Sequence, residues 1–168
     1  KCVLELGGSD PFIVLEDADI DKAVATGLTA RFQNNGQSCI AANRIYAQKG
    51  IYEAFLKAFA KRVSALALGD GFNEATDIGP LIDKAGVAKV EEHLDDAVAG
   101  GATILSGGKS SGGQLMPPTL LRDVAPDALL TREETFGPLA GVIPFAAEEE
   151  GVRFANDTPF GLAAYLCS

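Results

Sequence analysis

The chain has 168 residues, of which 47% are hydrophobic and 22% are charged, and this is an ordinary composition for one soluble globular domain with a real core. Its formal net charge of −9 and the absence of a lysine or arginine cluster argue against a nucleic acid or an anionic membrane as a partner. No apolar run approaches the roughly 20 residues that a membrane-spanning helix needs, and no signal peptide is visible.

The three cysteines, Cys2, Cys39 and Cys167, are odd in number and widely spaced, and the chain has one histidine. This pattern offers neither the ligand spacing of a zinc site nor a disulfide framework. We therefore expect no bound metal and a reducing, cytoplasmic location. The chain starts at Lys1 and ends on an apolar run, so we expect it to be part of a longer polypeptide.

The first apolar runs, at 2–6 and 11–15, predict two buried strands with a tight connection. Glu5 is unusual inside the first run, because a buried carboxylate is costly unless it is paired, protonated or open to a cavity. The alternative is that this run lies at a sheet edge, where Glu5 faces water.

Three amphipathic helices are predicted, at about 19–32, 51–66 and 83–98. Asp17 or Asp19 caps the first of them. In the second, Ile51, Phe55, Phe59 and Val63 are expected on one face. In the third, the expected inward stripe is Val87, Val90, Leu94 and Val98. We place His93 on the polar, solvated face of that helix because its neighbours are acidic.

Further strands are predicted at 43–48, 102–105, 139–145 and 160–166, an extended segment at 116–130, and a helix at 148–156. The glycine-rich segment 106–113 lacks the spacing of a phosphate-binding loop, so we expect an exposed, hairpin-like loop. Strands that alternate with helices predict an α/β layered domain with a largely parallel sheet flanked by helices.

The stretch FQNNGQSC, at 32–39, follows the first helix and has the layout that a covalent catalyst needs. Asn34, Asn35 and Gly36 tolerate positive φ and so allow the chain to leave the helix. Cys39 just beyond this exit would combine a nucleophilic thiol with its own N–H as a donor to the developing oxyanion. The alternative is a buried structural cysteine.

Four stretches together resemble the aldehyde dehydrogenase superfamily, in the right order and across the whole chain. They are LELGGSDPF at 4–12, FQNNGQSC at 32–39, REETFGPL at 132–139 and NDTPFGLAAY at 156–165. The sequence KCVLELGGSDPFIVL is most similar to the succinate-semialdehyde dehydrogenase branch. The resemblance implies that residues 1–168 are the nucleophile-bearing catalytic domain, and that the cofactor-binding and oligomerisation segments lie outside this chain.

The resemblance also implies roles for four residues. Cys39 would attack the aldehyde and pass through a thiohemiacetal and a thioester, and Glu5 would activate the water that hydrolyses the thioester. Glu134 and Phe136 would hold the nicotinamide end of NAD or NADP. A second oxyanion donor would come from outside the chain, and so would the residues that distinguish the two cofactors.

The implied reaction oxidises succinate semialdehyde to succinate in a parent that is a homo-oligomer, and the isolated fragment would be inactive. Two positions depart from the pattern. Gln33 stands where many members of this branch have an arginine for the substrate carboxylate, and an amide lacks the charged fork. Ala41 replaces the second cysteine of a redox switch found in some relatives. A broad-range enzyme for neutral or amino aldehydes and a non-catalytic fragment therefore remain alternatives.

Overall fold

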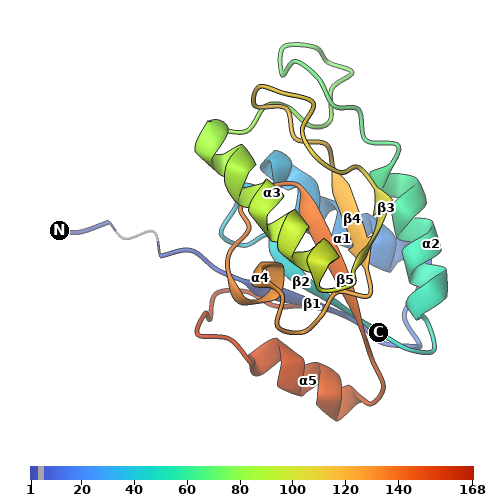
Figure 1. Cartoon of the computed structure of the whole chain (residues 1–168). Coiled ribbons are helices and arrows are strands. Elements are labelled where there is room, and N and C mark those ends of the chain that lie inside the picture. The colour runs from blue at the N-terminus through green and yellow to red at the C-terminus, as the bar shows by residue number, and fades with distance from the viewer. Residues whose placement is uncertain (4–5) are drawn as a thin grey trace.

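The structure of the chain is a computed structural model that describes residues 1–3 and 6–168. Its centre is a six-stranded sheet in the order β3-β4-β5-β2-β1-β6 (Figure 1). The neighbouring strands β4, β5, β2, β1 and β6 are parallel, and β3 is antiparallel to β4. The strands are β1 (Asp10–Val14), β2 (Ala42–Gln48), β3 (Thr103–Ser106), β4 (Thr119–Arg122), β5 (Leu139–Phe145) and β6 (Tyr165–Cys167).

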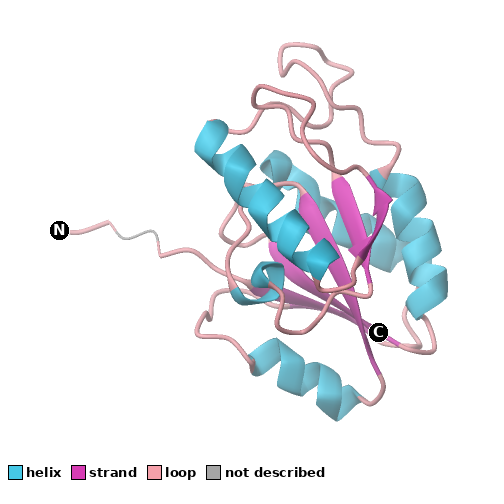
Figure 2. Cartoon of the chain, in the orientation of Figure 1, coloured by secondary structure: helices cyan, strands magenta, loops and turns pink. Residues whose placement is uncertain are grey.

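Helices cover both faces of this sheet, which confirms the predicted α/β layered domain with a largely parallel sheet (Figure 2). On one face lie α1 (Ile20–Phe32) and α2 (Tyr52–Val63), and on the other lie α3 (Lys84–Ala99), the short α4 (Leu129–Arg132) and α5 (Glu148–Asn156). Of the two candidate caps for α1, Asp19 is the one used, because its side chain accepts a hydrogen bond from the N–H of Lys22.

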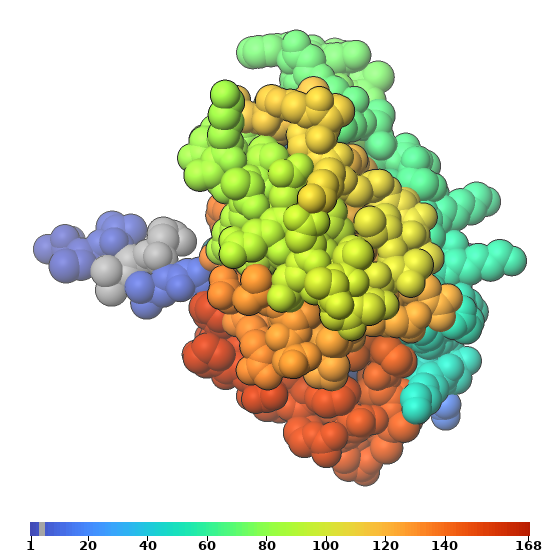
Figure 3. Space-filling model, in the orientation of Figure 1, coloured from blue at the N-terminus to red at the C-terminus, as the bar shows by residue number. Residues whose placement is uncertain are grey.

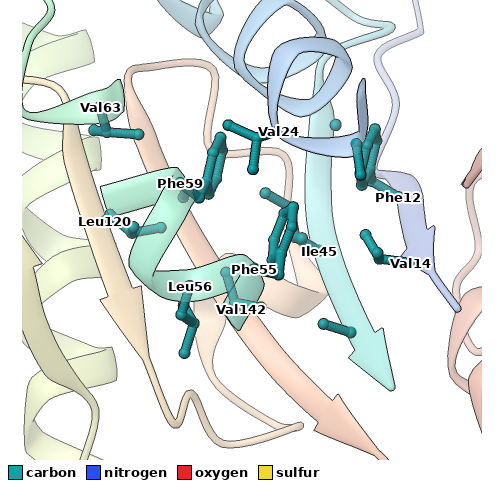
Figure 4. Packing of buried hydrophobic residues seen from close by; sticks show 14 of the residues in the cluster. Phe12, Val14, Val24, Ile45, Phe55, Leu56, Phe59, Val63, Leu120 and Val142 are labelled. Atoms are coloured by element: carbon teal, nitrogen blue, oxygen red, sulfur yellow. The ribbon is translucent and has the colours of Figure 1, made fainter. Parts of the chain in front are cut away.

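The core forms two layers because the strands send alternate side chains to opposite faces. Along β5, Ala140 and Val142 pack under α1 and α2, while Leu139, Ile143 and Phe145 pack under α3 and α5. The first layer is shown in Figure 4, where aromatic rings of α2 lie over the central strands. The stripe predicted for α2, Ile51, Phe55, Phe59 and Val63, is buried throughout and is confirmed.

Two predictions for α3 are wrong. Val98 is 42% exposed and His93 only 1% exposed, so the buried stripe is Val87, Val90, His93, Leu94 and Ala97. The geometry of a helix explains why His93, and not Val98, lies on the buried face. At 3.6 residues per turn His93 lies about 60° around the axis from Val90, whereas Val98 lies about 80° away. The acidic neighbours of His93 point elsewhere, and its imidazole faces the segment that follows α4.

The chain termini and two loops also depart from the predicted pattern. Residues 1–3 and 6–9 form no strand, and the side chains of Val3 and Leu6 are exposed. Glu5 lies outside the described residues. The extended segment predicted up to residue 130 ends at Arg122 and gives way to turns and α4, and β6 begins only at Tyr165.

The glycine-rich segment at 106–113 connects the antiparallel strands β3 and β4, as predicted. Beyond it, the chain packs against the loop that precedes α3, and the two segments gather at the top of the space-filling view (Figure 3). Backbone hydrogen bonding joins them, since the N–H of Leu81 donates to the carbonyl of Gln114 at 2.8 Å.

Candidate active site

Four loops meet at the edge of the sheet where β5, β2, β1 and β6 begin. These strands are neighbours and run parallel, so the segments before them enter at the same edge. The segments are 133–138, 37–41, 6–9 and 158–164. Positions that are far apart in the sequence are therefore adjacent in space.

The loop that carries Cys39 leaves α1 through a strained turn. After Phe32, a short 3₁₀ segment contains Asn34 at φ 51°, Asn35 at φ 58° and Gly36 at φ 71°. This confirms the prediction that these residues supply positive φ at the helix exit. The side chain of Asn34 donates to the Gln37 carbonyl at 2.8 Å and so braces the turn.

A second asparagine attaches the same loop to the segment before α3. The amide of Asn35 donates to the carbonyl of Pro80 at 3.1 Å and accepts from the N–H of Gly79 at 3.0 Å. Gln37 accepts from the N–H of Ile82 at 2.9 Å. The backbone that presents Cys39 is therefore fixed from two sides.

Cys39 is half-buried and lies between two pockets that share Gly7 as a second lining residue. One pocket, of about 720 Å³, is walled by Leu6 and by the segment Pro159, Phe160, Gly161 and Leu162. The other, of about 350 Å³, is lined by Gln37, Ser38, Glu134 and Phe136. A thiol in this position can be reached by two ligands from different sides.

Two glycines make this close arrangement possible. A Cβ on Gly8 would lie 2.3 Å from the carbonyl oxygen of Cys39, and one on Gly7, at φ 76°, would lie 2.8 Å from Oε2 of Glu134. Larger residues would push residues 6–9 away from the Cys39 loop. The N–H of Gly8 donates to Oε1 of Glu134 at 3.1 Å, which ties residues 6–9 to the segment 133–138.

The residues expected to hold the cofactor lie on the smaller pocket. Phe136 has φ 54° and a partly exposed ring, so the backbone is turned in a way that presents the ring to the pocket. Glu134 adds a carboxylate, which lies against Gly7 in the space that a Cβ there would need. A carboxylate acceptor beside an aromatic surface fits the sugar end of a dinucleotide.

His93 supports this loop from behind. Its Nδ1 lies 3.1 Å from Oγ1 of Thr135, and its Nε2 lies 3.6 Å from a carboxylate oxygen of Glu133. Burial is the largest influence on the pKa of His93 and lowers it, Lys89 lowers it further, and Glu133 partly offsets them. A neutral imidazole therefore backs the loop that carries Glu134.

Three of the four predicted site residues, Cys39, Glu134 and Phe136, line one pocket, while Glu5 lies outside the described residues. Gln33 is elsewhere: it lines a pocket of about 470 Å³ between α1 and Tyr165. Neither pocket at Cys39 has a lysine or arginine in its described lining.

Sequence reasoning missed Arg31 and Asn43, which are buried behind the site. The available signal was a charged and an amide side chain at positions where the helix and strand patterns predict core.

Within residues 1–3 and 6–168, no group of three or more histidine, cysteine or acidic side chains could hold a metal ion. No helix of that part of the chain is long and apolar enough to cross a membrane.

The comparisons with known proteins agree with one another. The family model described as "Aldehyde dehydrogenase family" matches residues 1–168. A glutarate-semialdehyde dehydrogenase of Pseudomonas putida is 52% identical over 166 residues, covering 99% of this chain and 35% of its own length. The succinate-semialdehyde dehydrogenase [NADP(+)] of Escherichia coli is 51% identical over 168 residues, again covering 99% of this chain and 35% of its own length.

Solved structures give the same result. The crystal structure of a succinate-semialdehyde dehydrogenase from Burkholderia pseudomallei has a TM-score of 0.96 and 50% identity, over 98% of this chain and 35% of that one. The chain thus spans about a third of the length of the relatives it matches.

Proposed function

The chain belongs to the aldehyde dehydrogenase family, and from this premise we propose that it is the nucleophile-bearing catalytic domain of an NAD(P)-dependent enzyme that oxidises an aldehyde to a carboxylate. The observation that carries the proposal is the position of Cys39, half-buried between two pockets of which one also holds Glu134 and Phe136. One pocket would admit the aldehyde and the other the cofactor.

In the first step the thiolate of Cys39 adds to the aldehyde carbon and forms a thiohemiacetal. The N–H of Cys39 has no hydrogen-bond partner within the described residues, so it can donate to the oxygen on which negative charge develops. The second donor would come from outside residues 1–168. Loss of hydride from the tetrahedral carbon then leaves a thioester on Cys39.

NAD(P)+, when bound, supplies the acceptor for that hydride. On this chain, Glu134 would accept hydrogen bonds from ribose hydroxyls and Phe136 would pack against the adjoining surface. The E. coli relative is named for NADP+, and the choice between NAD+ and NADP+ rests on residues outside this chain.

Hydrolysis completes the reaction. Water attacks the thioester carbon, Glu5 takes the proton, and the thiolate of Cys39 leaves with release of the carboxylate. The role of Glu5 rests on the resemblance of LELGGSDPF to the family pattern. A base of this kind acts after the hydride has left, so its removal should spare the first turnover.

We propose a semialdehyde with a distal carboxylate as substrate, with succinate semialdehyde first, because the relatives are named for succinate and glutarate semialdehydes. Since the described pocket linings contain no lysine or arginine, the cation for that carboxylate would lie outside residues 1–168. The second candidate is a broader enzyme for neutral or amino aldehydes, which the lack of a lysine or arginine in the described linings of both Cys39 pockets favours.

The test uses the full-length protein that contains these 168 residues. NAD(P)H formation is followed with succinate semialdehyde, glutarate semialdehyde and butanal, for the parent and for Cys39→Ser. Cys167→Ser, at the far end of β6, is the matched control. We expect activity to be lost in Cys39→Ser alone. Turnover by Cys39→Ser at the parent rate would refute the function, and a preference for butanal would favour the broader enzyme.

Glu5→Gln separates the two halves of the reaction. Steady-state turnover should fall by about 10²–10⁴, while a first-turnover burst of NAD(P)H survives. Loss of the burst would mean that Glu5 also acts on the thiol. Residues 1–168 alone should form no NAD(P)H, because the cofactor domain and half of the oxyanion site are missing.

A further inference from the structure

A buried amide holds the segment that precedes β5. Asn43, in β2, is 2% exposed, and its Nδ2 donates to the carbonyl of Leu130 at 3.0 Å and to that of Glu133 at 2.8 Å. Its Oδ1 accepts from the N–H of Thr135 at 3.3 Å. One side chain thus fixes the backbone immediately before and immediately after Glu134.

Arg31 fixes the other end of the same segment. It lies in the last turn of α1 and is 1% exposed. Its Nη2 donates to the carbonyl of Gly137, directly after Phe136, and its Nη1 lies 3.4 Å from Oδ1 of Asn43. Arg31 and Asn43 together therefore hold the backbone on both sides of Glu134 and Phe136.

The nucleophile loop uses the same anchor. Gly36 packs so closely on the Gly137 carbonyl that an added Cβ would lie 2.4 Å from its oxygen. Arg31 ends the helix that delivers the Cys39 loop, and its guanidinium grips that carbonyl from the other direction. The relative position of Cys39 and Glu134 therefore depends on contacts that converge on one peptide group.

The free-energy cost of burying the charged side chain of Arg31 indicates that this residue does more than fill the core. Its Nε is buried with no hydrogen-bond partner in the described part of the chain. Burial lowers the pKa of its guanidinium to about 10, although the charge of Glu134 acts in the opposite direction, so it stays charged at neutral pH. A buried ion pair can often be replaced as a whole by apolar side chains without loss of stability, so a buried charge with an unsatisfied donor is weak evidence of a purely structural role.

We propose that Arg31 and Asn43 are positioning residues, which set the place of the cofactor's ribose end relative to Cys39. The proposal rests on the proposed function, because it assumes that Glu134 and Phe136 meet the cofactor. Neither residue touches the reacting atoms. Their effect should appear in cofactor affinity and in the rate that depends on it, while aldehyde binding is largely spared.

The experiment compares Arg31→Met, Arg31→Lys and Asn43→Ala in the full-length protein. The dissociation constant for NADPH is measured by fluorescence without aldehyde, together with KM for succinate semialdehyde, the midpoint of thermal unfolding and the rate of Cys39 alkylation by iodoacetamide. Arg44→Met is the matched control, since Arg44 is equally buried but its guanidinium bonds the carbonyls of Ser9, Phe154 and Ala155 and none within residues 133–138.

We expect Arg31→Met and Asn43→Ala to weaken NADPH binding about ten-fold, with KM for the aldehyde changed much less. Arg31→Lys keeps the charge and one donor, so it should recover part of the affinity. Arg44→Met should lower the unfolding midpoint without a comparable loss of affinity. If Arg31→Met does not fold, Arg31→Lys and Asn43→Ala still carry the comparison.

Two failures can be told apart. A parent that neither binds NADPH nor depends on Cys39 refutes the proposed function. A parent that does both, with variants that bind NADPH as it does, refutes only the positioning role. Equal losses of affinity in Arg31→Met and Arg44→Met would also overturn the proposal, because the effect would then follow general destabilisation.

Discussion

Replacement of Gly36 by alanine is the sharpest test of the strained turn before Cys39. Gly36 has φ 71°, and an added Cβ would lie 2.4 Å from the carbonyl oxygen of Gly137 and 3.0 Å from that of Arg31. Both atoms belong to the backbone, so neither can rotate away. The substitution must move the Cys39 loop, the segment before β5, or both.

Two separate terms make up the expected loss of stability. The left-handed conformation costs about 1–2 kcal/mol for a residue with a Cβ. The overlap with fixed backbone atoms adds about 1–3 kcal/mol, as overpacked sites do. The chain offers a control for the first term: Gly113 has φ 70°, and a Cβ there would meet nothing within 4 Å. Gly113→Ala should therefore show the conformational cost alone.

The assay is urea unfolding of the 168-residue chain. It gives the free energy of unfolding and the slope of the transition for the parent, Gly36→Ala and Gly113→Ala. We expect Gly36→Ala to lose about 2–5 kcal/mol and Gly113→Ala about 1–2 kcal/mol. The rate at which iodoacetamide alkylates Cys39 should change only in Gly36→Ala, because only that substitution displaces the loop. Equal losses of stability together with equal alkylation rates would show that Gly36 is not packed on Gly137 as described.

The other predictions concern the supports of the site. Burial lowers the pKa of His93 below 6.5, so as the pH falls the imidazole is protonated in the unfolded chain before it is protonated in the folded chain. The free energy of unfolding should therefore fall as the pH drops below about 6.5, and His93→Gln should flatten that part of its pH profile, measured by urea unfolding. Asp10→Asn keeps the acceptor for the N–H of Ala163 and removes a buried charge, so it should be at least as stable as the parent. Asp10→Ala removes the acceptor as well and should lower the free energy of unfolding by about 1–3 kcal/mol in the same assay. Tyr165→Phe removes the hydrogen bond of 2.7 Å from the Tyr165 hydroxyl to the Ile40 carbonyl. It should lower the free energy of unfolding by about 0.5–1.5 kcal/mol and speed Cys39 alkylation, and an unchanged alkylation rate would show that this bond does not hold the turn.

Local patterns were enough to predict most of the fold. The periodicity of α2 is a property of neighbouring residues, and it gave the buried face of that helix correctly. The positive φ values of Asn34, Asn35 and Gly36 were predicted from residue types alone. Of the strand expected at 2–6, the described residues 2, 3 and 6 are not in a strand, and an apolar run by itself does not indicate whether a pairing partner is present.

The supports of the site could not be predicted in this way. Arg31 bonds Gly137, and Asn43 bonds Leu130 and Glu133, across long separations in the sequence that no local period reports. His93 misled for a related reason: its acidic neighbours suggested solvent, but its ring meets Thr135 from another element. Cys39, the proposed nucleophile, stood out because it follows a helix exit and belongs to a stretch that resembles a known family.

The edge of the sheet at which the loops meet also needs explanation. Ligand sites of open parallel sheets usually lie beyond the carboxyl ends of the strands. Here that edge is closed by local hydrogen bonds, since the amide of Gln48 accepts from the N–H of Glu16 at 2.9 Å and donates to the carbonyl of Ala146 at 3.3 Å. The loops around Cys39 enter at the amino ends instead. Because β5, β2, β1 and β6 are consecutive in the sheet, the loops before β2 and β1, which carry Cys39 and Gly7, lie between the Glu134 segment on one side and residues 158–164 on the other. The strand order alone therefore places the proposed nucleophile between the proposed cofactor and aldehyde, and a reordering of these strands would separate them.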